Sequence, residues 1–427
     1  MSSVPVSAPA RSLDPPPVPP GEPAPPPHPL KIAHFRNLWI GSTISLFGDQ
    51  FYLVALPWLV LQLTGSSLIL GTILMTSAIP RTALMLVGGA LTDRVSPRRV
   101  LLSTSLIRML LIGALGALVW FDVVQLWHIY VLTVAFGIAN AFSIPAVGAL
   151  VPTLVQPQQL QRANSVLQGS MATVQTSGQA PAGFIIRGWG VPSALFLDAL
   201  SFLAVIAALF RLPDPPRVPR PADAPPRPRM LDSIREGLRT VWNDPPLRSL
   251  MIVFATMNIC VAGPISIGLP TLARFEFGTP TAFGILLSCF SAGSIGGILL
   301  CSLVKRPRWR GLKFIAAGAL AGLVLISLGL MHKLVFMGVV LAVMGVGIGF
   351  VNVNFNTWVQ MRTDRALLGR VLSIVMLVVV GLLPASYAIC GVIAQWSLRG
   401  LFIGAGSLLF ATCLGVALTS KAAREID

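Results

Sequence analysis

The feature that most limits the fold of this chain is a series of apolar runs, about twelve in number and each about 20 residues long. That length lets a helix cross the hydrocarbon core of a bilayer. Only 11% of the 427 residues are charged, whereas a soluble domain carries about 25%. Because lipid offers no hydrogen bonds to the backbone, runs of this kind must form helices. We therefore predict an all-α polytopic membrane protein with spans near 37–63, 68–92, 100–121, 127–155, 160–187, 192–211, 247–272, 280–304, 312–331, 334–361, 367–397 and 399–420.

One polar segment precedes the series of apolar runs, and one long polar segment interrupts it. Residues 1–30 are dominated by proline, which excludes a helix or a core, so we expect a disordered cytoplasmic tail. Residues 212–246 begin as a Pro- and Arg-rich linker and continue into an amphipathic segment, 230–242. This segment is typical of a helix at the inner membrane interface, although a solvated linker helix is an alternative. The predicted division is a tail (1–30), a six-helix half (31–211), a linker (212–246) and a second six-helix half (247–427).

The two halves are related by one constant offset of 208 residues. It pairs Gly137 with Gly345 and Gly88-Gly89 with Gly296-Gly297, and it also pairs the basic positions Arg98 with Arg306 and Arg162 with Arg370. Glycine is common, so one coincidence would mean little. A single offset across four separate features indicates duplication of a six-helix unit.

The formal net charge of +16 would suggest nucleic-acid binding in a soluble protein. In this chain most Lys and Arg residues fall in the tails or in alternate loops between the apolar runs. That distribution follows the positive-inside rule. It predicts that both termini are cytoplasmic and that the chain has no nucleic-acid partner.

Four ionisable side chains lie inside the predicted spans, where each costs about 2.5–3.5 kcal/mol. Asp49 lies near the middle of the first span, and we interpret it as a proton-coupling candidate because burial disfavours its charged form. The alternative is that Asp49 has a structural role and hydrogen-bonds neighbouring helix ends where Gly48 weakens the first helix. Arg81 follows Pro80 in the second span. It could pair with Asp49 in coupling, act as a fixed structural partner, or line the cavity.

The other two charges lie nearer the ends of their spans. Arg108 enters the third span from the inner side and is an inner-gate candidate, although it could only snorkel. Asp198 lies towards the outer end of the sixth span, where proton handling competes with local capping or pairing with Arg187.

The offset of 208 residues places Met257 opposite Asp49 and Gly406 opposite Asp198. Because the second half lacks these acids, we hypothesise that coupling resides in the first half and that the second half mainly shapes the cargo cavity. Uncharged polar side chains within the spans could hydrogen-bond a substrate there or hold helices together. These substrate-cavity candidates are Gln50, Asn258, Asn352 and Asn356.

A polar island, 88–100, separates the second and third spans. Its spacing resembles the loop motif G-x-L-x-D-R-x-x-R-R of the major facilitator superfamily, with one extra residue before the arginine pair. The matching residues are Gly89, Leu91, Asp93, Arg94, Arg98 and Arg99. The corresponding loop of the second half, 305–310, has no acid. We therefore expect Asp93 and its arginines to act as a gating latch for the outward-facing state.

Further stretches resemble the branch of this superfamily that holds macrolide-efflux proteins and the enterobactin exporter. They are 35–39, 48–50, 55–58, 162–164, 198–202 and 369–373. The resemblance implies a proton-driven exporter of hydrophobic or amphiphilic compounds in the bacterial inner membrane. Two departures weaken the antiport inference: Gly178 and Pro181 are separated where an antiporter motif would join them, and Thr133 occupies the region of a helix-four arginine.

No spacing of residues predicts an enzyme, a metal site, a cofactor or ATP-driven transport. The expected partners are a small-molecule substrate, protons and the lipid bilayer, and we expect a monomer. Two alternatives stay open. One is an exporter or facilitator of another cargo, such as a siderophore, a lysolipid or a nutrient. The other is a membrane receptor that does not transport.

Overall fold

The computed structural model describes residues 28–94, 96–213, 230–303, 310–363 and 365–421. Within these ranges the side chains of 85–94, 230–234, 302, 310, 365, 366 and 369 are not described. The described chain is helical throughout its regular elements. Those of the first half are α1 (Ala33–Thr64), α2 (Ser67–Arg94), α3 (Pro97–Trp120), α4 (Leu126–Leu150) and α5 (Leu160–Phe210), with short 3-10 turns at Pro29–Lys31, Val151–Thr153 and Pro157–Gln159.

The long helix α5 contains two membrane crossings. Its 51 residues would extend about 77 Å at 1.5 Å per residue, more than twice the thickness of a bilayer core. The helix breaks at Gly190, whose φ of 81° is readily adopted only by glycine. We refer to the parts before and after Gly190 as α5a and α5b. The boundary falls between the predicted spans 160–187 and 192–211.

The second half repeats this arrangement. Its first crossing, Pro245–Phe277, consists of α7 (Pro245–Gly263), α8 (Leu269–Leu272) and two π-helical turns. The remaining elements are α9 (Pro280–Leu303), α10 (Arg310–Leu330), α11 (Leu334–Arg362), α12 (Arg365–Gly381), α13 (Leu383–Trp396) and α14 (Leu398–Thr419). In the described chain, 11 helical segments are long and apolar enough to cross a membrane, and the two parts of α5 raise the number of crossings to twelve.

Equivalent helices of the two halves also pack in equivalent ways. Gly137 of α4 lies so close to α2 that an added Cβ would be 2.5 Å from the carbonyl oxygen of Ser77. Its counterpart, Gly345 of α11, lies as close to α9, where a Cβ would be 2.2 Å from the carbonyl oxygen of Phe290. The same glycine therefore brings the same pair of backbones together in each half, which supports the predicted duplication.

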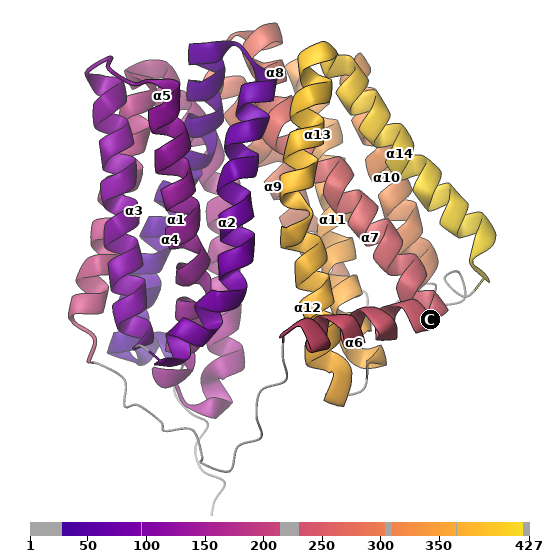
Figure 1. Ribbon diagram of the computed structural model, residues 1–427, viewed down its shortest axis with the longest axis horizontal. Coiled ribbons are helices and arrows are strands. Elements are labelled where there is room, and N and C mark those ends of the chain that lie inside the picture. Colours follow the sequence, from indigo (N-terminus) through magenta and orange to yellow (C-terminus); the bar gives the residue numbers. More distant parts are fainter. Residues whose placement is uncertain (1–27, 95, 214–229, 304–309, 364, 422–427) are drawn as a thin grey trace, which may run out of the picture.

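The two halves stand side by side (Figure 1), with α1–α5 in one bundle and α7–α14 in the other. We call the face where α1 begins and α14 ends, at the bottom of Figure 1, the tail face. Near the other face the bundles approach closely through glycines. A Cβ on Gly71 of α2 would lie 2.8 Å from the Cα of Gly391 in α13, and one on Gly183 of α5a would lie 2.7 Å from the carbonyl oxygen of Pro280.

Hydrogen bonds between the halves also lie away from the tail face. Gln395, at the end of α13, accepts from the hydroxyl of Ser66 at 2.9 Å. The hydroxyl of Ser288 in α9 accepts from the backbone N–H of Ala180 at 2.9 Å, nearer the membrane centre. These contacts describe a conformation in which the halves are closed at the face opposite the tails.

The linker helix α6 (Met230–Asn243) lies across the tail face against α12 and α7 (Figure 1). Val241 is buried, and Glu236 forms an ion pair with Arg370 of α12. Leu238 and Trp242 are exposed. A helix is therefore present where the sequence predicts one, and its place at the inner membrane interface stays a prediction.

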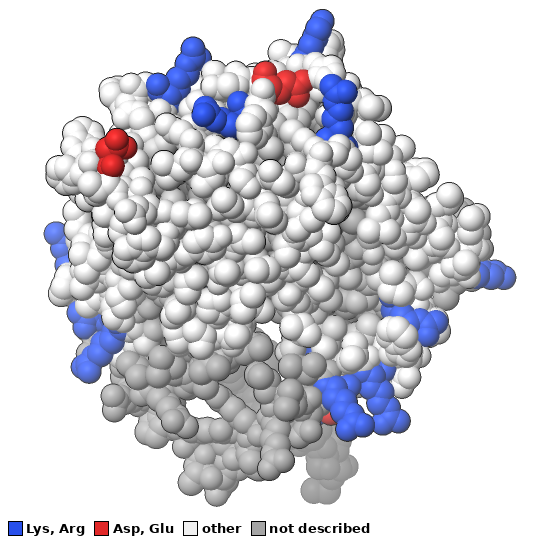
Figure 2. Space-filling view, turned by 45° about the horizontal axis from the view of Figure 1, so that its top comes forward, with Lys and Arg blue, Asp and Glu red and all other residues white. Residues whose placement is uncertain are grey.

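Charged side chains on the visible surface gather mostly towards its two ends and leave a broad uncharged band between them (Figure 2). Such a band is expected where a protein contacts hydrocarbon, because charges there are costly. The charges described below lie inside the first bundle.

Candidate coupling and substrate site

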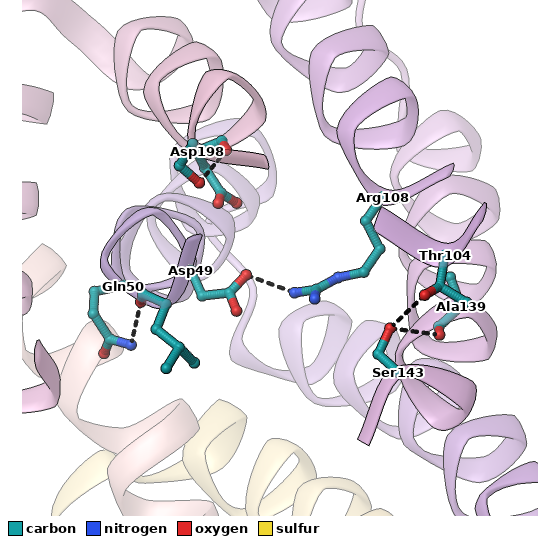
Figure 3. Close-up of polar contacts among 9 residues, drawn as sticks. Asp49, Gln50, Thr104, Arg108, Ala139, Ser143 and Asp198 are labelled. Carbon is teal, nitrogen blue, oxygen red and sulfur yellow. Dashed lines mark hydrogen bonds and ion pairs between the residues drawn. The ribbon is translucent and has the colours of Figure 1, made fainter. Parts of the chain in front are cut away.

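An ion pair between Asp49 of α1 and Arg108 of α3 lies inside the first half (Figure 3). The Arg108 Nη2 donates to Asp49 Oδ1 at 2.5 Å. The Arg108 side chain is 11% exposed and that of Asp49 is 25% exposed. A charge-assisted bond in such surroundings is stronger than the same bond in water, because the local dielectric is low.

Two aromatic rings flank the Arg108 guanidinium. Its central carbon lies 4.7 Å from the ring centre of Phe136 on α4 and 4.6 Å from that of Phe202 on α5b. Both contacts fall within the range of cation–π attraction. The rings also exclude water, and the Arg108 Nε has no hydrogen-bond partner in the described chain. Arg108 is thus held in position by α4 and α5b while retaining an unused donor.

Asp198 of α5b is fully buried beside this pair. Neither carboxylate oxygen has a hydrogen-bond partner among the described residues. The nearby Ser201 hydroxyl donates instead to the main-chain carbonyl of Asp198 at 2.7 Å. Room for the carboxyl group comes from Gly48 of α1, where a Cβ would lie 2.8 Å from Asp198 Oδ1. An unpaired buried carboxylate is very costly, and such a group is neutralised instead.

These three side chains form one electrostatic set, since the charge of Arg108 acts on both carboxyl groups. Two ionised carboxylates and one guanidinium would carry a net charge of −1. One bound proton makes the set neutral, which is the favoured state away from water. The net charge of the set therefore depends on whether one proton is bound.

The structure brings together three of the four predicted intramembrane charges. Asp49 pairs with Arg108, although it was Arg81 that the sequence suggested as a partner, and no ion pair joins Arg81 to a described acid. Arg187 is exposed and makes no ion pair with the buried Asp198. Arg108 lies 59 residues from Asp49 in sequence. No local pattern could have shown that they meet.

Two adjoining cavities lie beside this set and between the halves. The smaller, of about 140 Å³, is lined by residues of α1, α2, α4 and α13: Tyr52, Leu53, Leu56, Pro57, Leu74, Ser77, Ala78, Arg81, Phe136, Gly137, Asn140 and Tyr387. The larger, of about 340 Å³, is lined by Gln50, Leu53, Pro57, Leu74, Gln175, Gln179, Ile265, Ser266, Phe283, Leu287, Phe290, Ser291 and Tyr387. The two cavities form one region, because they share the lining residues Leu53, Pro57, Leu74 and Tyr387. Its lining is mostly apolar and aromatic, as in many small-molecule sites.

A chain of amides crosses the larger cavity. The Gln179 amide donates to Gln50 Oε1 at 3.3 Å, and its oxygen accepts from the hydroxyl of Ser291 on α9 at 3.1 Å. Gln179 was not among the residues singled out from the sequence as cavity candidates. A signal was present, because Gln179 lies between Gly178 and Pro181 where the antiporter motif is interrupted.

The other polar candidates lie elsewhere. Asn258 donates weakly to a carbonyl of its own helix at 3.5 Å, and Asn356 donates to the carbonyl of Asn352 at 2.8 Å. Asn352 is exposed. None of the three lines the two cavities. Of the four substrate-cavity candidates, only Gln50 lies there.

The gating motif is only partly visible. The Arg98 Nε donates to the carbonyl oxygen of Leu209 at 2.7 Å, at the end of α5b, where cations stabilise a helix C-terminus. Arg99 is exposed. The surroundings of Gly89 and the side chains of Asp93 and Arg94 lie outside what the structure describes. The predicted latch therefore stays a prediction.

Comparison with known proteins assigns this chain to a family. The model of the family described as "Transmembrane secretion effector" matches residues 24–426. The chain is 24% identical over 345 residues to macrolide efflux protein A of Streptococcus pyogenes, covering 80% of this chain and 84% of that protein. It is 28% identical over 359 residues to the multidrug efflux pump Tap of Mycolicibacterium fortuitum, covering 81% and 84%.

Solved structures show the same fold at low sequence identity. The nucleoside transporter NupG superimposes with a TM-score of 0.72 at 11% identity, covering 91% of this chain and 100% of that structure. An inward-facing bacterial homologue of the iron transporter ferroportin gives a TM-score of 0.67 at 16% identity, covering 90% and 98%. The chain therefore belongs to the transmembrane secretion effector family of major facilitator transporters, and it is a multi-pass membrane transporter rather than an enzyme.

Proposed function

We propose that this protein is a proton-coupled exporter of hydrophobic or amphiphilic small molecules in a bacterial inner membrane. The observation that carries the proposal is the fully buried, unpartnered carboxyl of Asp198 beside the Asp49–Arg108 ion pair. Two acids that share one guanidinium form a set whose charge changes by one when a proton binds. A transporter uses such a change to couple proton movement to a conformational change.

Arg108 is the element that links the two acids. With Asp198 protonated, Arg108 pairs with Asp49, as in this structure. Protonation of Asp49 releases the guanidinium, which then pairs with Asp198 as the Asp198 carboxyl gives up its own proton to water. Because Asp49 is on α1, Arg108 on α3 and Asp198 on α5b, an exchange of partners shifts these helices relative to one another. The proton state thereby biases the orientation of the first half.

The conformation fits one stage of export. We infer from the positive-inside pattern that the tail face and both termini are cytoplasmic. Closure through Gly71, Gly391 and Gly183 at the opposite face then makes this an inward-facing state. Cargo enters the cavity from the cytoplasm or the inner leaflet and leaves after the halves rock. The apolar lining and the efflux relatives support an amphiphilic cargo.

Purified protein in proteoliposomes tests the coupling. An imposed pH gradient should drive accumulation of a fluorescent cargo, selected by first comparing a toxic-compound panel in cells lacking and overproducing the protein. Asp198→Asn should lower gradient-driven accumulation at least tenfold while retaining exchange of cargo without a gradient. The matched control is Asp122→Asn, because Asp122 is exposed in the α3–α4 loop and its φ of 57° suits asparagine.

Unchanged gradient-driven transport in both Asp198→Asn and Asp49→Asn would overturn the assignment of proton coupling to these two acids. Failure of the pH gradient to drive accumulation by the wild-type protein would overturn proton coupling itself, and the protein would then be a facilitator, the alternative retained from the sequence. Loss of gradient-free exchange together with coupling would show that Asp198 is needed for the transport cycle itself.

A further inference from the structure

We propose that Arg81 binds a negatively charged group of the cargo, so that the site takes amphiphilic monoanions such as aromatic or aliphatic carboxylates. This inference rests on the proposed function, since it assumes that the region between the halves holds cargo. It begins from an unusual feature of the smaller cavity, which is a cation in the membrane interior with no acid beside it in the part of the chain that the structure describes.

Arg81 lies in α2 immediately after Pro80, and its side chain lines the smaller cavity. It makes no ion pair, hydrogen bond or aromatic stacking contact with any described residue. The described acids within the membrane-spanning helices are Asp49, Asp198 and, at the end of its crossing, Glu276, which pairs with His332. The charge that acts on Asp49 and Asp198 belongs to Arg108. The positive charge of Arg81 is therefore not offset by any acid among the described side chains.

A lone cation inside a membrane protein is costly and marks a site of function by default. Arg108 shows how this chain stabilises a buried arginine that pairs within the protein, because Arg108 contacts both an acid and two aromatic rings. Arg81 has neither, although Phe136 borders the same cavity. The contrast indicates that the partner of Arg81 comes from outside the chain.

Three further donors belong to residues that line the same cavity and have no hydrogen-bond partner in the described chain: the amide of Asn140 on α4 and the hydroxyls of Tyr52 on α1 and Tyr387 on α13. The Ser77 hydroxyl is not available, since it donates to the carbonyl of Thr133 at 2.9 Å. A guanidinium, an amide and two phenols around one small volume match a carboxylate, which accepts several hydrogen bonds and pairs with arginine through two of them.

The rest of the region determines what the anion is attached to. Beyond Leu53, Pro57, Leu74 and Tyr387 the larger cavity of about 340 Å³ offers apolar walls and the amides at Gln179. A ligand whose carboxylate lies at Arg81 would extend its apolar part into this volume. One arginine with no second cation in either lining favours a single negative charge. Tyr387 belongs to the second half, so a bound anion would contact both halves.

The test measures equilibrium binding to purified protein in nanodiscs by calorimetry, with matched probes that differ only in charge. The pairs are 1-naphthylacetate with 1-naphthylacetamide, and decanoate with decanamide. We expect each anion to bind the wild-type protein at least tenfold more tightly than its amide. Arg81→Gln should remove that preference by weakening anion binding alone, and Arg81→Lys should retain part of it. Arg187→Gln, a change at an exposed arginine, should bind as wild type.

Equal affinity for anion and amide in the wild-type protein would overturn the proposal, and this comparison needs no variant to fold. An equal loss of both probes in Arg81→Gln, or a preference that persists in it, would also overturn it. Because binding is measured without a pH gradient, the result is independent of proton coupling. Anion preference with Asp198→Asn uncoupled would support both proposals. Proton coupling without a preference for the anion would support the proposed exporter and overturn anion binding at Arg81.

Discussion

The two halves of this transporter share one helix plan but differ in what fills their interiors. Positions 49, 108 and 198 of the first half are Asp, Arg and Asp, whereas the corresponding positions of the second half are Met257, Ala316 and Gly406. The charged set is therefore built into one bundle only. The difference indicates that the two halves keep equivalent helix contacts while only the first holds a buried charged set, to which we assign proton coupling.

The second half stabilises its interior by apolar contact. Phe254 and Phe355 stack with ring centres 4.4 Å apart, and Phe314 lies 5.5 Å from Phe355. Gly406, the counterpart of Asp198, lies so close to α10 that a Cβ would be 2.4 Å from the carbonyl oxygen of Gly322. A position that holds a buried acid in one half thus allows close backbone contact in the other.

The largest effect should come from breaking the charged set of the first half. Arg108→Met would leave Asp49 without its cation, and removal of one partner of a buried ion pair costs about 3–5 kcal/mol. Unfolding in detergent, followed by circular dichroism, measures the loss. Asp49→Asn in the same chain should restore much of the stability. In the other half, Met257→Leu at the counterpart of Asp49 should cost under about 1.5 kcal/mol. Equal costs at both positions would remove the distinction between the halves.

A somewhat smaller loss is expected from Phe355→Ala in the aromatic cluster. Such truncations cost about 3–5 kcal/mol in soluble cores. We expect the lower end, because lipid tails are as apolar as the lost ring and only packing is forfeited. Thermal unfolding gives the cost, and transport by the folded fraction should keep its dependence on the pH gradient. Altered coupling in this variant would mean that the second half takes part in proton handling.

A moderate effect should follow Gly406→Ala. The added methyl group would meet the α10 backbone, and overpacking of this kind costs about 1–3 kcal/mol. Gly404→Ala is the control two residues away, where a Cβ would meet nothing within 4 Å. That control should be neutral or slightly stabilising, since alanine favours a helix more than glycine does. The melting temperatures of the two variants test whether helices are in close contact at Gly406. Similar destabilisation of both variants would argue against that contact.

The smallest effect on stability should come from Ser291→Ala, which removes one hydrogen bond between the halves. Such bonds contribute about 0.6 kcal/mol on average within membranes. The consequence to measure is conformational, because the bond to Gln179 joins α9 to α5a. Spin labels across the tail face should report a shift away from the closed arrangement at the opposite face. Ser327→Ala, whose hydroxyl donates to a carbonyl of its own helix, should leave the distance distribution unchanged.

The sequence by itself determined the helices, their number and their repetition. Apolar runs of bilayer length and the break before Val191 are local properties, because each helix satisfies its own backbone. The offset of 208 residues also aligned the packing glycines Gly137 and Gly345 correctly. The buried acids were identifiable because a charge inside a span stands out from its neighbours.

Only the tertiary structure decided which of these residues meet. The sequence suggested Arg81 as the partner of Asp49 and Arg108 as an inner-gate candidate. In the structure Arg108 pairs with Asp49, and Arg81 lines a cavity with no acid among its lining residues. It placed Gln179, rather than Asn258, Asn352 or Asn356, against the cavity. The physical reason is that helical periodicity fixes the face of a side chain on its own helix, whereas the rotation and tilt of each helix depend on contacts with segments distant in sequence.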